Sequence, residues 1–177
     1  VPEPAEALVA YGEGVVQTPR YQIWNGSAWG GENSAQSVGG TIQWVRTKAG
    51  TTRDEYILGV QDASSDINVQ IYNGTSSTWG NLLEMTTTVS DPTRRGFDVA
   101  YETVSGDALV VYCDGDSDPS SRIWNGSSWT FVGTATTTSA NNCNYVSLAS
   151  DPTSDEIIMV TRDTGSGYEA FVWSGST

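Results

Sequence analysis

The chain has 177 residues, enough for one domain or one block of repeats with a buried core, and 7 Trp, 8 Tyr and 19 Gly are typical of short strands and tight turns. Its formal net charge of −13 argues against a nucleic-acid partner, because binding phosphates requires clustered cations. No apolar run approaches the length of about 18 residues that a membrane span requires, so none is predicted.

A repeated phrase organises the chain. Ile-Trp-Asn-Gly-Ser-x-Trp occurs at 23–29 and again at 123–129, with looser copies at 71–75 and 172–176. The aromatic residues of the four copies are spaced by 48, 52 and 49 residues, which suits one four-stranded propeller blade and is too long for a solenoid coil. These equivalent residues are Trp24, Tyr72, Trp124 and Trp173. We predict a single all-β, β-propeller-like domain with units at approximately 1–38, 39–89, 90–139 and 140–177.

A second landmark keeps the same register. An acidic residue opens an apolar run 18, 18, 17 and 18 residues before each aromatic marker; the four are Glu6, Asp54, Asp107 and Asp155. The runs are continuously apolar, as expected for a strand that is covered on both faces, and we assign them to the second strand of each blade.

The remaining strands follow from these markers. Third strands are predicted at 21–24, 69–72, 122–124 and 170–173, each closing in Asn-Gly or Ser-Gly, which predicts a type I′ hairpin turn. Fourth strands start near Trp29, Trp79 and Trp129 and continue into Thr- and Ser-rich sequence typical of exposed edges. First strands, nearest the axis, are predicted at 42–46, 97–101 and 145–148.

The predicted units have three, four, four and three strands, 14 in all. The first unit lacks its inner strand and the last lacks its outer strand. Three interpretations follow: a four-bladed propeller in which two blades have only three strands, a segment of a longer array, or subunits that complete one another's sheets. We expect a homo-oligomer or homopolymer formed by strand complementation. The chain begins with Val1, so we also expect that a leader was removed or that the chain is part of a longer protein, and either fits secretion.

Cys113 and Cys143 are the two cysteines, and they lie neither in a C-x-x-C pair nor near any histidine. This argues against a metal site and predicts a disulfide between neighbouring blades, the alternative being two buried thiols. A disulfide suits a secreted or cell-surface protein.

Three turns carry N-x-[Ser/Thr] sequons, at Asn25, Asn73 and Asn125. They are candidate N-glycosylation sites, and Asn-Gly is also the pair that a hairpin turn demands. Asp114, Asp116 and Asp118 resemble the start of a calcium loop, but Pro119 and Asn125 stand where that loop needs Gly and Glu, so a solvated turn is favoured.

Trp29, Trp79 and Trp129 are candidate platforms for stacking glycans, although packing between blades is the favoured role of these side chains. Catalytic residues are not predicted, because the chain has no histidine and its acidic residues recur in register with the repeat, as structural residues do. We therefore expect that the protein is not an enzyme.

The Trp24-Asn25-Gly26 and Trp124-Asn125-Gly126 triplets, each followed by a further Trp, resemble the repeats of fucose-binding β-propeller lectins. The resemblance implies a propeller fold, and short members of that family assemble one propeller from several chains. In that family an Arg and a Glu hold the sugar, and no such pair stands at matching positions in successive units here.

These patterns favour a non-catalytic extracellular protein with a structural or adhesive role, which self-assembles through its incomplete terminal blades into a surface polymer or filament. The alternative is a lectin-like carbohydrate-binding module.

Overall fold

The computed structural model describes residues 7–176, and in this range 14 strands form four antiparallel sheets without a helix. The first sheet holds β1 (Ala7–Tyr11), β2 (Arg20–Trp24) and β3 (Asn33–Ser34). The second holds β4 (Ile42–Ala49), β5 (Glu55–Asp62), β6 (Ile67–Asn73) and β7 (Thr78–Thr86). The third holds β8 (Phe97–Tyr101), β9 (Ala108–Tyr112), β10 (Ser120–Trp124) and β11 (Trp129–Thr134), and the fourth holds β12 (Cys143–Ser150), β13 (Ile157–Asp163) and β14 (Tyr168–Trp173).

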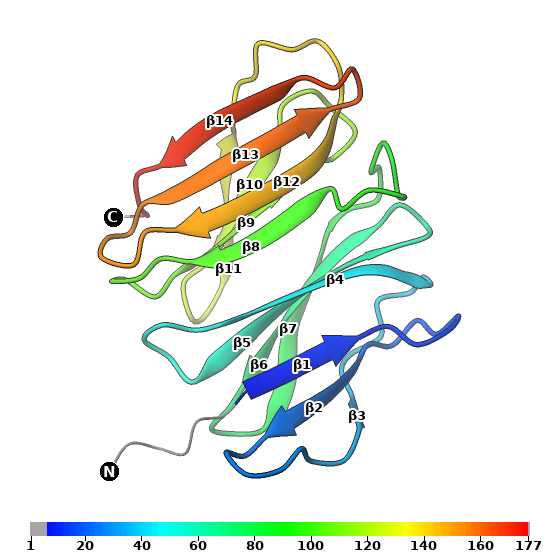
Figure 1. Ribbon diagram of the computed structural model, residues 1–177, viewed down its shortest axis with the longest axis vertical. Helices are drawn as coiled ribbons and strands as arrows, with labels where there is room; N and C mark the ends of the chain where they lie inside the picture. The colour runs from blue at the N-terminus through cyan, green and yellow to red at the C-terminus, as the bar shows by residue number, and fades with distance from the viewer. Residues whose placement is uncertain (1–6, 177) are drawn as a thin grey trace.

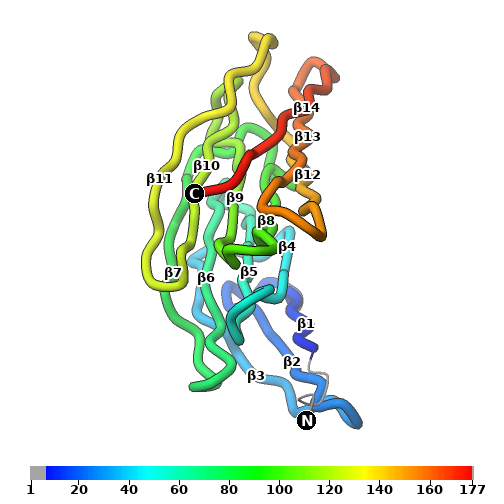
Figure 2. The backbone as a smooth tube through the Cα atoms, turned by 90° about the vertical axis from the view of Figure 1, so that its left-hand side faces the viewer, coloured from blue at the N-terminus to red at the C-terminus, as the bar shows by residue number. Residues whose placement is uncertain are grey.

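The four sheets follow one another along the long axis of the molecule (Figure 1). Figure 2 places β4, β8 and β12 along one side of this array and β7 and β11 along the other. The predicted all-β, propeller-like array of three, four, four and three strands is thereby confirmed. Of the four acidic landmarks, Glu6 lies outside the described residues.

The middle strands β5 and β9 are covered on both faces because their side chains alternate between two neighbouring sheets. On β5, Leu58 and Val60 pack against the first sheet, whereas Ile57 belongs to the core shared with the third. On β9, Val110 belongs to that same core and Leu109 packs against the fourth sheet. This double coverage explains why the apolar runs in the sequence are continuous and do not alternate.

The aromatic hairpins differ from the predicted type I′ turn. Trp24 pairs with Trp29 across a four-residue loop in which Gly26, at φ +91°, has the positive φ and Asn25 does not. The Asn25 Oδ1 atom instead accepts hydrogen bonds from the backbone N–H groups of Ser27 (3.0 Å) and Ala28 (2.9 Å). The type I′ prediction was wrong because the asparagine side chain itself supplies the acceptor that organises a longer loop.

A disulfide joins the third and fourth sheets. Cys113 directly follows β9 and Cys143 begins β12; both side chains are buried, and their Cα atoms lie 5.3 Å apart.

Candidate binding cavity on the inner strands

A cavity of about 570 Å³ opens between β4, β12 and the segment that leads into β8. It therefore lies between two inner strands and the segment before a third, on the side of the array where Figure 2 places β4, β8 and β12. Arginine and aromatic side chains dominate its wall. The lining residues are Trp44, Val45, Arg46, Thr93, Arg94, Arg95, Tyr145 and Ser147.

Two of the arginines are held by one buried carboxylate. Asp98 on β8 is fully buried and accepts hydrogen bonds from Arg46 at Nε (2.9 Å) and Nη2 (3.2 Å). Arg95 Nη1 lies 3.4 Å from the same carboxylate, and the backbone N–H of Leu148 donates to it at 3.0 Å. Asp98 thus connects β4, β8 and β12, and it fixes the two guanidinium groups at the cavity wall.

The cavity keeps an excess of positive charge. Arg94 is half exposed and pairs with Asp91, with 3.2 Å between Nε and Oδ2. Three guanidinium groups therefore face two carboxylates, Asp91 and Asp98, and one positive charge remains uncompensated among these groups. Three of the chain's eight cationic residues are gathered at this place in a chain of net charge −13.

Aromatic rings complete the wall. The Arg95 guanidinium lies 5.2 Å from the ring centroid of Tyr145, and its Nη2 donates a hydrogen bond to the Tyr145 hydroxyl at 3.1 Å. Trp44 is 39% exposed, so part of its indole remains available to a ligand. A ring face next to guanidinium donors suits a ligand that has both an apolar face and an anionic group.

Carboxylates do not line this cavity among the described residues, and those nearest to it are engaged by arginine. Asp91 and Asp98 therefore act here as partners that hold guanidinium groups in place.

The three tryptophans proposed as glycan platforms differ in accessibility. Trp79 packs against Tyr21 and Tyr72, with centroid distances of 5.4 and 5.2 Å, and it is half-buried. Trp129 is also half-buried, lies 5.3 Å from Trp124 and donates from Nε1 to the Asn81 carbonyl at 3.0 Å.

The third of these residues, Trp29, is 50% exposed, with its ring 5.7 Å from Trp24. Of the three rings, that of Trp29 is therefore the most accessible to a glycan.

The sequon asparagines are exposed, and each uses its Oδ1 atom to organise its own loop. Asn125 accepts hydrogen bonds from the backbone N–H groups of Ser127 and Ser128, both at 3.0 Å, in the same way as Asn25. Asn73 accepts one from the Ser76 N–H at 2.9 Å. Glycosylation of these residues stays a prediction.

The acidic run after β9 has local partners. Asp114 accepts a hydrogen bond from the Ser120 hydroxyl at 2.6 Å, and Asp118 accepts bonds from the Thr137 N–H and hydroxyl at 2.8 and 2.9 Å. Asp116 is exposed, and its carbonyl accepts from the Cys143 N–H at 2.8 Å. In the part of the chain that the structure describes, no three potential ligand side chains cluster as a metal site would require. Calcium binding stays a prediction.

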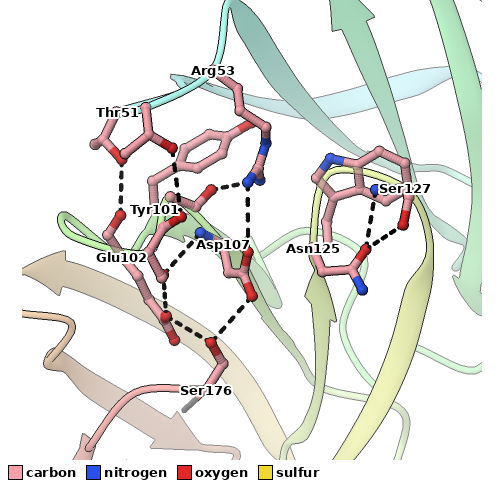
Figure 3. A network of polar contacts seen from close by, with 12 residues as sticks. Thr51, Arg53, Tyr101, Glu102, Asp107, Asn125, Ser127 and Ser176 are labelled. Atoms are coloured by element: carbon pink, nitrogen blue, oxygen red, sulfur yellow. Dashed lines mark hydrogen bonds and ion pairs between the residues drawn. The ribbon is translucent and has the colours of Figure 1, made fainter.

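Two hydrogen bonds between tryptophan and glutamate also connect the sheets. Trp124 of the third sheet donates from Nε1 to Glu55 of the second at 3.2 Å, and Trp173 of the fourth donates to Glu102 of the third at 2.6 Å. Figure 3 shows the surrounding polar network, in which the Ser176 hydroxyl donates to Glu102 at 2.8 Å and Asp107 at 3.1 Å. Both glutamates are buried, so these contacts fix how successive sheets are docked.

The sequence matches no protein-family model and no curated protein. Solved structures are similar in fold. The fucose-specific lectin from Aleuria aurantia aligns with 97% of this chain and 58% of its own, at 14% identity and a TM-score of 0.58. The intramolecular trans-sialidase from Ruminococcus gnavus aligns with 94% of this chain and 40% of its own, at 12% identity and a TM-score of 0.56.

The β-propeller domain of the trilobed protease from Pyrococcus furiosus aligns with 97% of this chain and 52% of its own, at 8% identity and a TM-score of 0.54. The fold is that of a β-propeller. The chain spans between 40% and 58% of these three proteins, so its four sheets correspond to part of a propeller that is not closed. Within residues 7–176, no helix has the length and apolar character needed to cross a membrane.

Proposed function

We propose that the protein is a secreted, non-catalytic carbohydrate-binding module whose cavity on the inner strands takes acidic glycans. The observation that carries the proposal is the convergence of Arg46, Arg94 and Arg95 with the rings of Trp44 and Tyr145. A guanidinium group binds a carboxylate through two parallel hydrogen bonds, and an aromatic ring packs against the apolar face of a sugar. The lectin among the similar folds supports carbohydrate as the ligand class, and the disulfide supports secretion.

The test is a glycan array followed by calorimetry with one acidic oligosaccharide and its neutral counterpart. We expect competable binding of the acidic glycan and at least tenfold weaker binding of the neutral one. Arg94→Ala removes a half-exposed guanidinium and should weaken binding about tenfold, which corresponds to about 1.4 kcal/mol.

The matched control is Lys48→Ala. Lys48 is exposed on the same strand as Arg46 but is not part of the cavity wall, so its removal should leave the affinity within twofold. No binding to any acidic glycan, or equal losses in the two variants, would contradict the proposal.

A second candidate function is structural, as a surface polymer built by strand complementation. Its support is an apolar groove of about 260 Å³ beside β14. At this place the described residues of the fourth sheet include no strand equivalent to β11. Val132, Met159, Phe171 and Trp173 are among the residues that line it. An added strand would pair with β14 and cover these side chains.

Electron microscopy of the purified chain tests this role. Filaments that disappear with Val132→Asp, which places a charge in the groove, would support strand addition. Filaments that persist in this variant would contradict it.

A further inference from the structure

The positions that make the contacts between sheets remain apolar on the fourth sheet, where no sheet of the described residues covers them. Ile57 and Ile71 face each other across β5 and β6, and they are 0% and 3% exposed. The equivalent pair of the third sheet, Leu109 and Ile123, is 1% and 4% exposed.

The equivalent pair of the fourth sheet is Ile158 and Val172, and here the exposed fractions are 53% and 63%. The side chains have the same character in all three sheets, and their burial alone differs. A face that is built to pack is therefore left bare on the fourth sheet.

One face of the first sheet is complementary to this bare face of the fourth sheet. Each sheet meets the preceding one through alternate residues of its second strand, and Leu58, Val110 and Met159 occupy one such position at 0%, 0% and 5% exposure. Val9 occupies it in β1 and is 39% exposed. The first sheet thus presents an exposed face that is equivalent to the faces packed against preceding sheets elsewhere in the chain.

A polar pair also joins the second and third sheets. Trp124 donates a hydrogen bond to Glu55. In β5, Glu55 directly precedes the residue that pairs with Tyr72 of β6. Glu156 is the equivalent of Glu55 in the fourth sheet, because it directly precedes the residue that pairs with Trp173. Its side chain is exposed. Trp24 is the equivalent of Trp124 and lies at the end of β2. Trp24 and Glu156 are thus the repeat equivalents of Trp124 and Glu55, which form a hydrogen bond between the third and second sheets.

We propose that the fourth sheet of one copy packs against the first sheet of a second copy, with Ile158 and Val172 covering Val9, and Trp24 donating to Glu156. The structure favours a second copy as the partner because successive sheets of the chain already pack against each other in this way. The fourth sheet of one copy and the first sheet of another would form the same kind of contact. The contact is head-to-tail, so it generates a ring if the rotation closes and a filament if it does not. It needs no added strand and does not depend on glycan binding.

Charge opposes this association. Each copy carries a net charge of −13, and the Coulomb repulsion between copies is screened by salt. We therefore expect the assembly to strengthen between 20 mM and 500 mM NaCl.

Sedimentation velocity of the full chain from 1 to 500 μM tests the proposal, with Ile158→Asp and Val9→Asp as variants. Both side chains are exposed, so neither substitution removes core packing. We expect oligomers for the unaltered chain and monomers for each variant alone. An equimolar mixture of the two variants should form dimers and nothing larger, because it holds one intact pair of complementary faces.

Two further variants show whether association depends on this contact. Val104→Asp alters a side chain that is 64% exposed on a loop of the third sheet, and it should assemble like the unaltered chain. Glu156→Ala should weaken association about tenfold. A monomer at every concentration and salt would overturn the proposal, as would oligomers that persist in Ile158→Asp or a mixture of the two variants that stays monomeric. Circular dichroism of each variant confirms folding, and glycan affinity should be the same in all of them.

Discussion

Arg46 on β4 and Asp98 on β8 form a two-pronged ion pair, with 2.9 Å from Nε to Oδ1 and 3.2 Å from Nη2 to Oδ2. Asp98 is fully buried, whereas the side chain of Arg46 is 39% exposed. The carboxylate therefore anchors a guanidinium group that reaches the cavity, and it joins two inner strands that hydrogen bonds of the backbone do not connect.

Asp98→Ala should destabilise the fold by about 3 to 5 kcal/mol, because Arg46, Arg95 and the Leu148 N–H lose their shared acceptor in a buried site. Urea denaturation followed by circular dichroism measures this change. Asp91→Ala is the control: its carboxylate pairs with the half-exposed Arg94, and its loss should cost less than about 1 kcal/mol. Equal costs for the two variants would contradict the role given to Asp98.

Glu55 should be a second stabilising carboxylate. It accepts hydrogen bonds from Trp124 Nε1 at 3.2 Å, the Tyr101 hydroxyl at 3.2 Å and Arg53 Nε at 3.1 Å. Burial and the nearby Glu55 charge raise the pKa of Tyr101, so the phenol stays a donor throughout the usual pH range. Glu55→Ala should cost about 3 kcal/mol, since three buried or half-buried donors lose their acceptor.

The control for Glu55 is its repeat equivalent. Glu156→Ala in dilute, monomeric protein should change the free energy of unfolding by less than about 0.5 kcal/mol, because the side chain is exposed. A large loss there, or a small loss in Glu55→Ala, would show that the repeat register assigns these roles incorrectly.

The sequence predicts the fold better than it predicts the cavity. Two landmarks per repeat were sufficient for the strands and their order, because middle strands that are covered on both faces require the apolar runs after Asp54 and Asp107. The run after Asp155 has the same apolar pattern, although Ile158 is exposed. The predicted first strand at 97–101 has the bounds of β8, and the one at 145–148 lies within β12.

The cavity was missed because the residue types that line it are not repeated from one unit to the next. Arg46, Arg94 and Tyr145 lie roughly 50 residues apart and are brought together by the arrangement of the sheets. The hairpin prediction failed for a local reason: the Asn25 side chain accepts the hydrogen bonds that organise its loop, and a dipeptide preference does not reveal loop length. The one signal available for the cavity was the adjacent pair Arg94 and Arg95 in a chain with few cations.

Reduction of the Cys113–Cys143 disulfide should lower stability by about 3 to 4 kcal/mol, the chain-entropy value for a loop that closes over 30 residues. Thermal unfolding with and without dithiothreitol measures this difference. At this chain length it corresponds to a fall of about 6 to 16 °C in the midpoint. Cys113→Ala combined with Cys143→Ala should show the lower midpoint without any response to reductant. An unchanged midpoint on confirmed reduction would contradict the expectation.

Acid should weaken the loop that follows Cys113. The Thr137 backbone N–H and hydroxyl hold the pKa of Asp118 below its ordinary value. A carboxyl whose pKa is lowered by folding stabilises the protein above its unfolded pKa, about 3.9, and this stabilisation is lost as pH falls through the folded pKa. Asp118→Asn should therefore be less stable than the unaltered chain at pH 7, and the difference should shrink below about pH 4.

Urea midpoints at pH 7, 5, 4 and 3 give this comparison. A difference that stays constant over the series would mean that the carboxylate charge contributes nothing.

The most direct test of the proposed function is a heteronuclear NMR titration of the nitrogen-15-labelled chain with an acidic oligosaccharide. The indole N–H resonance of Trp44 is assigned with Trp44→Phe. We predict that shifts of Trp44, Arg46 and Tyr145 saturate together, whereas the Trp29 indole does not respond. Shifts centred on Trp29, or no shifts at millimolar glycan, would contradict a carbohydrate site on the inner strands.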